Sequence, residues 1–399
     1  MKVLVLNCGS SSIKYKLIDM EKHEMLAQGG IEKIGMKDSF LKLVTPEDKK
    51  VVLEKSIPEH QTGVDFILEV LTSPENGCLK SLKEIDAVGH RVVHGGEKFN
   101  ASIRINQAVL DQIKECFDLA PLHNPANLIG IEAVEKSLPG IPQVAVFDTA
   151  FHQTMPPKAY MYGLPYEYYE KYAIRRYGFH GTSHRYVSKK ACEILGVNYE
   201  DQKIITAHIG NGASITAIKN GVSIDTSMGM TPVDGLLMGT RTGEIDGGVL
   251  TFLAEKEHLS ASKLSDVMNK KSGVLGISGL SSDMREIEAA VFAGHPRAKL
   301  AIDMYNYRIK KFVGSYAAAM GGLDILVFTG GVGENQWATR AAVCKNMEFM
   351  GIQFDYDKND GCRGKEIILS TPDSKVVVIV VPTDEEMMIA IDTETILSK

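Results

Sequence analysis

The sequence predicts an α/β protein built from two similar halves. Apolar runs of strand length alternate with segments of helical periodicity along the chain, which is typical of a substantially parallel sheet covered by helices. A chain of 399 residues is long enough for two domains. The opening run, in which apolar residues flank a turn at Gly9, recurs in the second half around Gly210. This recurrence indicates an internal duplication.

Composition and charge narrow the class of function. A formal net charge of −6 argues against broad binding to nucleic acid or to an anionic membrane. No apolar run reaches the ~18 residues of a membrane span, and the N-terminus enters a strand without a leader-like segment. The cysteines form no CxxC pair and show no zinc spacing with histidine: Cys8, Cys78, Cys116, Cys192, Cys344 and Cys362. We therefore expect a cytoplasmic protein without a structural metal.

The first half is expected to place polar side chains at strand ends. The expected elements are strands on both sides of the Gly9 turn and over residues 25–31 and 40–44, a helix over 62–71, a strand from 85, helices over 106–117 and from a cap at Asn124, and a strand over 144–147. Arg91 and Asp148 come where two of these strands end. Ligands of α/β sheets bind beyond the carboxyl ends of strands, so both residues are candidates for a site.

The second half is expected to repeat this alternation around a long loop. The expected elements are a helix over 183–195, a hairpin over 203–219, a loop over 223–248, three helices, a long amphipathic helix over 300–320, a buried strand from 324 that ends in a glycine turn, a helix, a strand over 376–381 and a last helix from a capping box of Thr383 and Glu386. A loop of this length inside a domain is usually functional or disordered. Arg241 and Asp246 favour a functional loop.

Three glycine-rich turns each follow a strand, at Gly9, at 210–212 and at 330–333. None is a GxxxxGK[ST] loop, and none is a GxGxxG segment that opens a helix. Together they could line a cleft with backbone amides that donate to the phosphates of a nucleotide, and Lys14 would add a charge beside the first turn. The alternative is three tight turns in a compact α/β protein.

Two arginines and two histidines occupy positions that suit an anion. Arg91 ends a strand near glycines, and Arg241 lies in a Gly/Thr loop, where a guanidinium can grip a carboxylate or phosphate at two points. His123 and His180 precede expected helix starts, which attract anions. Either ring could instead be a satisfied, partly buried side chain. The histidines that compete for the same role are His90, His94, His184 and His208.

Hard oxygen ligands for Mg²⁺ are also present. Asn7, Asp148 and Glu385 are candidates, because Mg²⁺ takes few protein oxygens and completes its shell with phosphates and water. Glu386 is explained by the expected capping box, which leaves Glu385 as the better ligand. An acid in the first helical turn can also simply complement the helix dipole.

Six segments, taken together, resemble the acetate kinase family: residues 7–14, 89–96, 179–184, 208–212, 239–243 and 331–335. The resemblance covers essentially the whole chain in order. It implies the fold of the acetate and sugar kinase, heat-shock chaperone and actin superfamily, with two duplicated ribonuclease H-like (actin-like ATPase) domains and a cleft between them. Residues 1–149 with the helix 386–399 would form the acetate-side domain, and residues 150–385 the nucleotide-binding and dimerisation domain of a homodimer.

The same resemblance implies roles at matching positions. Asp148, His180, Arg241 and Arg91 resemble the catalytic residues. The substrate contacts would be Arg91, Val93, Leu122, His123, Phe179 and Pro232. The nucleotide contacts would be Ser10, Ser12, Lys14, His208, Ile209, Gly210, Asn211, Gly212, Asp283, Met284, Arg285, Gly331, Val332, Gly333, Glu334 and Asn335. Asn7 and Glu385 resemble the Mg²⁺ ligands, with Mn²⁺ as a possible substitute, and ATP would be the co-substrate.

The implied activity is reversible, in-line transfer of the γ-phosphoryl group of ATP to acetate, which gives acetyl phosphate and ADP. Acetate is already ionised near neutral pH, so the nucleophile needs no general base, and we expect Asp148 to orient Arg91 or metal-bound water, although the resemblance implies a proton role for Asp148. Two alternatives stay open at this point. One is a kinase for propionate or butyrate, and the other is a non-enzymatic nucleotide switch of the actin and chaperone type.

Overall fold

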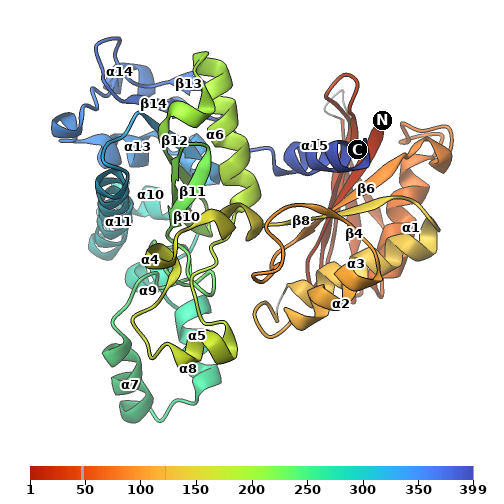
Figure 1. The fold of residues 1–399 in the computed structure, drawn as a ribbon, viewed down its shortest axis with the longest axis horizontal. Coiled ribbons are helices and arrows are strands. Elements are labelled where there is room, and N and C mark those ends of the chain that lie inside the picture. Colours follow the sequence, from red (N-terminus) through yellow and green to blue (C-terminus); the bar gives the residue numbers. More distant parts are fainter. Residues whose placement is uncertain (46–48, 122, 399) are drawn as a thin grey trace. The chain divides into compact units, whose positions relative to one another are not determined.

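The computed structural model describes residues 1–45, 49–121 and 123–398. The chain divides into two compact units, Met1–Phe151 with Asp384–Lys399 (unit 1) and His152–Thr383 (unit 2). The sequence placed the two divisions at 149/150 and 385/386, and the role it gave to each part stays a prediction. Each unit has its own sheet and its own covering helices (Figure 1).

The described part of unit 1 contains an eight-stranded sheet in the order β5-β4-β3-β2-β1-β6-β8-β7. The central strand β1 (Lys2–Cys8) pairs antiparallel with β2 (Ile13–Asp19) and parallel with β6 (Ala87–Val92), which pairs parallel with β8 (Gln143–Phe147). The outer strands are β3 (Glu24–Glu32), β4 (Phe40–Val44), β5 (Lys50–Glu54) and the short β7 (Ile103–Arg104). The carboxyl ends of three central strands therefore meet at one edge.

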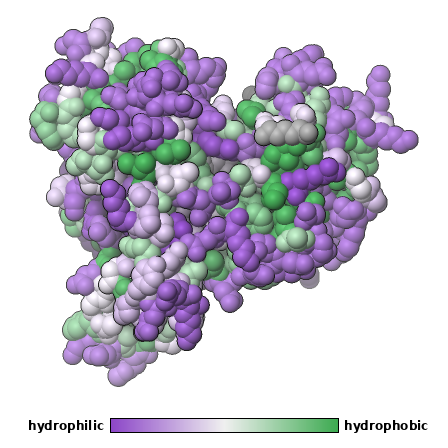
Figure 2. Space-filling view, in the orientation of Figure 1, coloured by the Kyte–Doolittle hydropathy of each residue, from purple (hydrophilic) through white to green (hydrophobic). Residues whose placement is uncertain are grey.

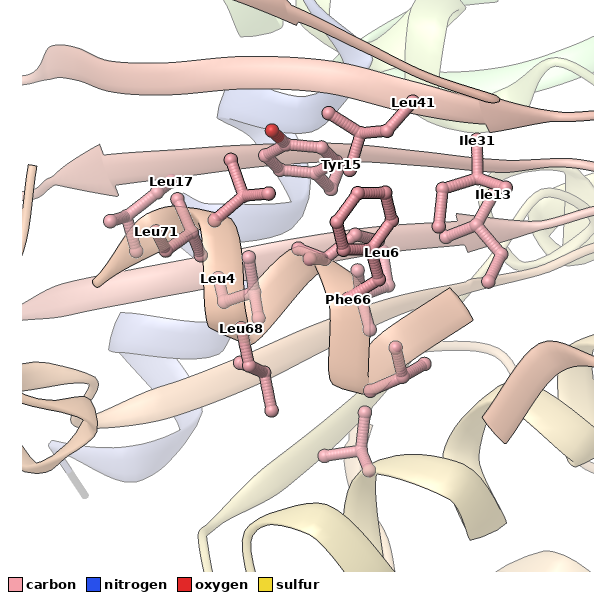
Figure 3. Packing of buried hydrophobic residues seen from close by; sticks show 14 of the residues in the cluster. Leu4, Leu6, Ile13, Tyr15, Leu17, Ile31, Leu41, Phe66, Leu68 and Leu71 are labelled. Atoms are coloured by element: carbon pink, nitrogen blue, oxygen red, sulfur yellow. The ribbon is translucent and has the colours of Figure 1, made fainter. Parts of the chain in front are cut away.

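Both faces of this sheet are buried, which explains why β1 reads as a continuous apolar run. Leu4 and Leu6 pack with residues of α1 on one face, as Figure 3 shows for Phe66 and Leu68. Val3 and the other residues whose side chains point to the opposite face of the sheet pack against α15. The helices of unit 1 are α1 (His60–Leu71), α2 (Gln107–Glu115), α3 (Asn124–Ser137) and α15 (Glu385–Leu397), with 3-10 turns η1 (Leu82–Glu84) and η2 (Ala150–Thr154), the latter running into unit 2.

The described part of unit 2 repeats the strand order around its own centre, as β11-β10-β9-β12-β14-β13. Strand β9 (Lys203–Ile209) pairs antiparallel with β10 (Ala213–Lys219) and parallel with β12 (Ile325–Thr329), which pairs parallel with β14 (Val377–Val380). The edge strands are β11 (Val222–Thr226) and β13 (Ile367–Ile368). The central strands thus follow the same senses in both units, and the predicted duplication is confirmed by topology.

Helices α6 and α11 pack against the unit 2 sheet, and Figure 1 shows the strands between them. The helices of this unit are α4 (Pro157–Tyr160), α5 (Glu167–Tyr172), α6 (Gly181–Leu195), α7 (Gly247–Lys256), α8 (Ala261–Lys270), α9 (Gly273–Ser278), α10 (Met284–Phe292), α11 (Pro296–Met320), α12 (Gly330–Asn335), α13 (Trp337–Cys344) and α14 (Tyr356–Asn359), with 3-10 turns η3 (Tyr199–Asp201) and η4 (Glu348–Met350). Four helices, α7 to α10, stand where the sequence predicted three.

Two predictions about chain segments in unit 2 were wrong. Residues 223–226 belong to strand β11 and not to the long loop, because Asn220 and Gly221 both have positive φ angles and form a tight hairpin turn. Residues 330–335 form the short helix α12 and not a glycine turn. The Glu334 carboxylate accepts the N–H of Gly330 at 2.9 Å, which satisfies one of the amides that a helix start leaves unpaired.

Two predicted helix caps were also wrong. Helix α15 is capped by Asp384, whose carboxylate accepts the N–H of Met387 at 2.9 Å, so Thr383 and Glu386 form no capping box. Helix α3 has its N-cap at His123 and not at Asn124. The Asn124 amide is instead bonded to both backbone groups of His94, at 3.1 and 2.9 Å. Caps therefore follow from partners that are distant in sequence as well as from local pattern.

Hydrophilic side chains cover much of the surface visible in Figure 2. In the described part of the chain, no helix combines the length and the apolar character that a membrane crossing needs.

Gly89 sets how closely α15 approaches β6. A Cβ at this position would lie 2.6 Å from Thr393 Oγ1 and 2.7 Å from Ile389 Cγ2, both on α15. We predict that Gly89→Ala lowers the free energy of unfolding by about 1–3 kcal/mol, as overpacking of a core does, because α15 must move. Urea unfolding measures this. Gly163→Ala, where a Cβ meets nothing within 4 Å, is the control. Equal stability of the two variants would contradict the prediction.

Candidate functional site

In unit 1, a polar cluster surrounds Arg91 at the carboxyl ends of the parallel strands. The guanidinium donates from Nε to Asp148 Oδ1 at 3.1 Å and from Nη2 to Asp148 Oδ2 at 2.5 Å. Its Nη1 donates to Asn7 Oδ1 at 3.3 Å. The Asp148 side chain is 1% exposed and that of Arg91 is 21% exposed. A two-point ion pair with a buried carboxylate holds the guanidinium in one orientation while part of it still faces solvent.

Glu385, the first residue of α15, adds a second carboxylate beside Arg91. Its Oε2 lies 4.0 Å from Arg91 Nε. The pKa of Glu385 is raised to about 7, chiefly by burial and with smaller contributions from the like charges of Asp148 and Glu386, while Arg91 and Lys14 lower it. The preceding residue, Asp384, is paired with Lys16 Nζ at 2.8 Å, which fixes the start of α15 on strand β2.

This oxygen-rich cluster fits a divalent cation. The pKa of Glu385 is raised chiefly because burial disfavours the ionised carboxylate, with added repulsion from Asp148 and Glu386, and a bound cation would stabilise the ionised form. Asn7 and Glu385 offer hard oxygens of the kind Mg²⁺ prefers. Among the described residues, no group of three or more His, Cys, Asp or Glu side chains is arranged to hold a metal ion. The chain would therefore supply few ligands, as is usual for Mg²⁺ bound with a nucleotide.

The remaining unit 1 candidates lie on or near the same elements. The turn between β1 and β2 is closed by the Gly9 N–H, which donates to the Ser12 carbonyl at 2.8 Å. Ser10 and Lys14 are exposed. Lys14 lies opposite Asn7 in the strand register, so its backbone adjoins the Arg91 cluster.

Two residues that the resemblance assigned to the substrate are held by α3. Val93 is 4% exposed, and its N–H donates to Asn127 Oδ1 at 3.1 Å. His123 is the N-cap of α3, where backbone N–H groups favour an anion. Leu122, the neighbouring candidate, lies outside the described residues. Phe179 and Pro232, the other candidates for the methyl pocket, belong to unit 2.

In unit 2, Arg241 and His180 lie on either side of Gly212. A Cβ built on Gly212 would be 3.4 Å from Arg241 Nη1 and 3.8 Å from His180 Nε2. The loop that carries Arg241 is tied to this turn, since the N–H of Gly239 donates to the Asn211 carbonyl at 3.0 Å. The rings of His180 and His208 stack with centroids 4.3 Å apart. Three residues distant in sequence therefore surround one small space.

Arg241 is a cation for which the described residues supply no counter-charge. Its Nη1 donates to the Pro232 carbonyl at 3.3 Å, and within the described part of the chain no carboxylate forms an ion pair with it. Burial lowers the pKa of Arg241, although a guanidinium stays charged at neutral pH. A half-buried, unneutralised guanidinium is costly unless an anion binds there.

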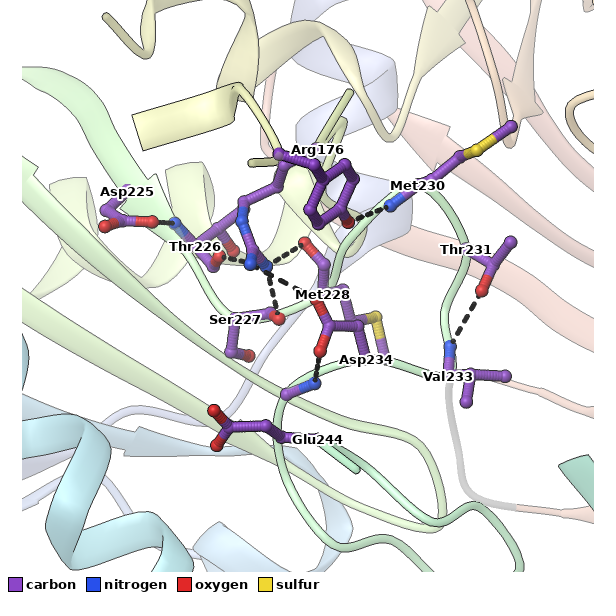
Figure 4. Close-up of polar contacts among 12 residues, drawn as sticks. Arg176, Asp225, Thr226, Ser227, Met228, Met230, Thr231, Val233, Asp234 and Glu244 are labelled. Carbon is purple, nitrogen blue, oxygen red and sulfur yellow. Dashed lines mark hydrogen bonds and ion pairs between the residues drawn. The ribbon is translucent and has the colours of Figure 1, made fainter. Parts of the chain in front are cut away.

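Arg176 organises the loop that leads to Arg241, a role that was not predicted from the sequence. Figure 4 shows its guanidinium among the carbonyls at the end of β11: Nη1 donates to Thr226, Ser227 and Met228 at 3.1, 2.7 and 3.1 Å. Its Nη2 pairs with Asp234 Oδ2 at 3.2 Å. These contacts fix both ends of residues 226–234, which include Pro232. No local sequence pattern around Arg176 predicts this role, because all its partners are distant in sequence.

A cavity of about 610 Å³ in unit 2 gathers three separate candidate segments. This volume lies within the range usual for small-molecule sites. The expected residues that line it are Gly210, Asn211, Asp283, Met284, Arg285, Gly331, Val332 and Asn335. The sequence reading missed four others that line it, Ser282, Glu288, Gln336 and Arg363. Ser282 and Gln336 adjoin expected segments, whereas Arg363 and Glu288 carried no recognisable signal.

The other expected nucleotide residues lie close to this cavity in sequence and support its walls. Ile209 and Gly333 pack under the turn, since a Cβ on Gly333 would lie 3.7 Å from Ile209 Cβ. Glu334 Oε1 also accepts the N–H of Thr383 at 3.1 Å. The Ser183 hydroxyl lies between His208 Nδ1, at 2.8 Å, and Thr383 Oγ1, at 2.7 Å. The last residue of unit 2 is thus bonded to two segments of this site.

A family model described as the acetokinase family matches residues 2–391. The chain belongs to the acetokinase family. It is 70% identical over 399 residues to an acetate kinase of Parabacteroides distasonis, with all of both chains covered.

Solved structures of related proteins share the fold. A crystal structure of Porphyromonas gingivalis acetate kinase matches with a TM-score of 0.97 and 66% identity over 99% of each chain. A propionate kinase from Francisella tularensis matches with a TM-score of 0.91 and 43% identity, also over 99% of each chain. The predicted actin-like ATPase fold with duplicated domains is therefore confirmed.

The raised pKa of Glu385 predicts how stability depends on pH without divalent cations. The folded protein binds this proton up to about pH 7, whereas a glutamate in the unfolded chain has a pKa near ~4.3. The contribution is therefore fully present below about pH 4 and is lost as the pH rises through about 7. We predict that Glu385→Gln removes this loss, which is on the order of 1–3 kcal/mol between pH 5 and pH 8.

Urea unfolding at both pH values measures the effect. Added Mg²⁺ should stabilise the unmodified protein at pH 8 much more than the Glu385→Gln variant, since ligand binding to the folded state adds to its stability. Identical pH profiles for the two proteins would contradict the assignment of this carboxyl group.

The space beside Gly212 predicts a second effect. In Gly212→Ala the new methyl group meets Arg241 and His180 at ordinary contact distances, so the fold should be retained. We predict a fall in kcat of about 100-fold, because the methyl group occupies space that a reacting group needs. Steady-state kinetics and thermal unfolding measure the two parts. Gly247→Ala, where a Cβ meets nothing within 4 Å, is the control. Unchanged kcat in Gly212→Ala would contradict the prediction.

Proposed function

We propose that this chain transfers the γ-phosphoryl group of ATP to acetate, reversibly and by direct in-line displacement, giving acetyl phosphate and ADP. The observation that carries the proposal is Arg241, a half-buried guanidinium that no carboxylate neutralises among the described residues and that lies beside His180 and Gly212. Such a group is suited to the charge of a phosphoryl group in transfer. Relatives that match the chain over its full length are named acetate kinase.

The chemistry requires orientation and charge compensation more than proton transfer. Acetate is ionised at neutral pH, so its oxygen is already a nucleophile. The main barrier is the repulsion between this anion and the phosphates. Arg91 would bind the carboxylate with the part of its guanidinium that faces solvent, while Asp148 holds the rest. Asp148 is therefore a positioning residue in this proposal.

His180 and Arg241 would bind the equatorial oxygens of the phosphoryl group during transfer. Arginines in this role contribute about 10³-fold or more to the rate in other phosphotransferases. In this proposal water is excluded from the phosphoryl group during turnover, which limits hydrolysis of ATP.

A divalent cation would be held by Asn7 and Glu385, and Mn²⁺ could replace Mg²⁺. When bound, it would neutralise phosphate charge that the chain's own cations do not reach. The nucleotide itself would occupy the unit 2 cavity lined by residues such as Asn211, Asp283 and Gly331. Lys14, Ser10 and Ser12 would contribute donors from the first hairpin.

Acetate is favoured over longer acids as the substrate. Val93, Phe179 and Pro232 would enclose its methyl group. One extra methylene changes selectivity by only about 10–200-fold, so propionate is expected to react more slowly, and butyrate more slowly still. The propionate kinase that matches the chain is more distant, at 43% identity. A non-enzymatic nucleotide switch is disfavoured, because such a protein has no need of an unneutralised arginine beside the phosphate turn.

We also propose that the protein acts as a cytoplasmic homodimer through unit 2. Large apolar side chains of α7, α10 and α11 are strongly exposed there: Phe252 at 58%, Phe292 at 81% and Tyr307 at 61%. Contiguous exposed apolar surface commonly marks an interface, and a dimer contact through these helices would bury all three side chains.

The test is formation of acyl phosphate, trapped as the hydroxamate, with ATP, Mg²⁺ and acetate, propionate or butyrate. We predict the highest kcat/KM for acetate, dependence on Mg²⁺, and a loss of about 10³-fold or more in Arg241→Ala. Arg104→Ala, at an exposed arginine of β7 that has no part in the proposed site, is the control and should retain normal kcat/KM. The absence of acetyl phosphate, or near-normal turnover by Arg241→Ala, would refute the proposal.

A further inference from the structure

A chain of hydrogen bonds runs through the interior of unit 2 and ends at His180. Thr206 Oγ1 lies 2.7 Å from His184 Nδ1, and His184 Nε2 lies 2.7 Å from Ser214 Oγ. Ser214 Oγ in turn lies 2.9 Å from His180 Nδ1. Thr206, His184 and Ser214 are all 0% exposed. The proposed function uses none of these three, yet the last of them contacts a residue that it does use.

The fold explains why these groups meet. His184 follows His180 by one turn at the start of α6, which puts both rings on the same side of the helix. Thr206 lies on β9, against which α6 packs, and Ser214 lies on β10, the antiparallel neighbour of β9. Two hydroxyl groups on adjacent strands therefore reach the two nitrogens of the His184 ring.

His184 is neutral in this setting. Burial lowers the pKa of His184 well below its ordinary value, and the neighbouring rings of His152 and His208 lower it further. A neutral imidazole carries one ring proton, so one of its nitrogens donates and the other accepts.

The number of available protons fixes which group donates in each of these hydrogen bonds. Thr206, His184 and Ser214 each bring one proton, and three contacts are to be filled. Within the described residues, the side-chain partner of the Thr206 hydroxyl is His184. The side-chain partners of the Ser214 hydroxyl are the rings of His184 and His180. Buried hydroxyl protons need acceptors, so Thr206 donates to His184 Nδ1, His184 donates from Nε2 to Ser214, and Ser214 donates to His180 Nδ1. The reverse direction leaves the Thr206 proton without an acceptor.

We propose that Thr206, His184 and Ser214 are positioning residues that hold His180 as the tautomer with its proton on Nε2. That nitrogen is on the side of the ring that faces Gly212 and Arg241. The ring then donates a hydrogen bond to a phosphoryl oxygen, and its Nε2 has no lone pair that would repel this oxygen or attack phosphorus. The inference rests on the proposed function for the role of His180, but the tautomer itself does not.

The tautomer can be measured on the full-length protein by long-range ¹H–¹⁵N NMR of labelled histidine. His180→Asn assigns the His180 signals by their loss. His152 is an internal reference, because its Nε2 lies 3.0 Å from the Phe179 carbonyl, which can only accept. We expect the His180 signals to show a protonated Nε2 and an unprotonated Nδ1.

Thr206→Val removes the first donor without changing side-chain shape. We expect the Nε2–H tautomer of His180 to lose population and kcat to fall about 10–100-fold, as losses of supporting hydrogen bonds do, with KM changed by less than about twofold. The matched control is Thr216→Val, the strand partner of Thr206, which is bonded to Thr226 instead. It should alter neither the tautomer nor kcat. Thr206→Ser, which keeps the hydroxyl group, should restore both and separates a lost donor from a damaged fold.

A proton on Nδ1 of His180 in the unmodified protein would overturn the inference. So would equal tautomer populations and equal kcat values in Thr206→Val and Thr216→Val. Failure of the proposed function looks different: the unmodified protein would make no acetyl phosphate, while the histidine spectra would still decide the direction of the proton chain.

Discussion

The ion pair between Arg91 and Asp148 is the interaction on which the unit 1 site depends. A guanidinium at the end of a buried strand is tolerable only with a counter-charge, and Asp148, at the end of the neighbouring parallel strand, supplies it at two points. This pairing aims the exposed part of Arg91 and gathers Asn7 and Glu385 around it. The parallel register of β1, β6 and β8 is what makes the meeting possible, because it brings three strand ends to one edge.

In unit 2 the same strand topology supports a site of the opposite charge. There, among the residues that the structure describes, Arg241 forms no ion pair with a carboxylate, and the Gly212 backbone, the His180 ring and the Pro232 carbonyl lie near it. One unit therefore groups carboxylate and amide oxygens that suit a cation, and the other carries a positive charge that suits an anion. A family that joins a carboxylate to a phosphoryl group needs both, since every reactant in that chemistry is charged.

The sequence was sufficient for features that depend on local pattern. It predicted the duplicated hairpins, the buried strands and the strand-end positions of Arg91 and Asp148, because strand periodicity and glycine turns are encoded over a few residues. It failed where a partner is distant in sequence. Asn124 is bonded to His94 and so does not cap α3, and Arg176 gathers carbonyls some fifty positions away. In the sequence, Ser214 looks like an ordinary small residue of a strand. Its hydroxyl contacts two histidines, which the adjacent residues in the sequence could not predict.

In the proposed reaction, one phosphoryl group passes directly from ATP to a carboxylate that Arg91 holds. The stereochemical course at phosphorus tests it most directly. With ATP made chiral at the γ-phosphorus by oxygen isotopes, a single in-line displacement inverts the configuration in acetyl phosphate. We expect inversion of configuration at phosphorus. Net retention would mean that a protein side chain accepts the phosphoryl group first, and it would contradict a site built only to orient and neutralise the two substrates.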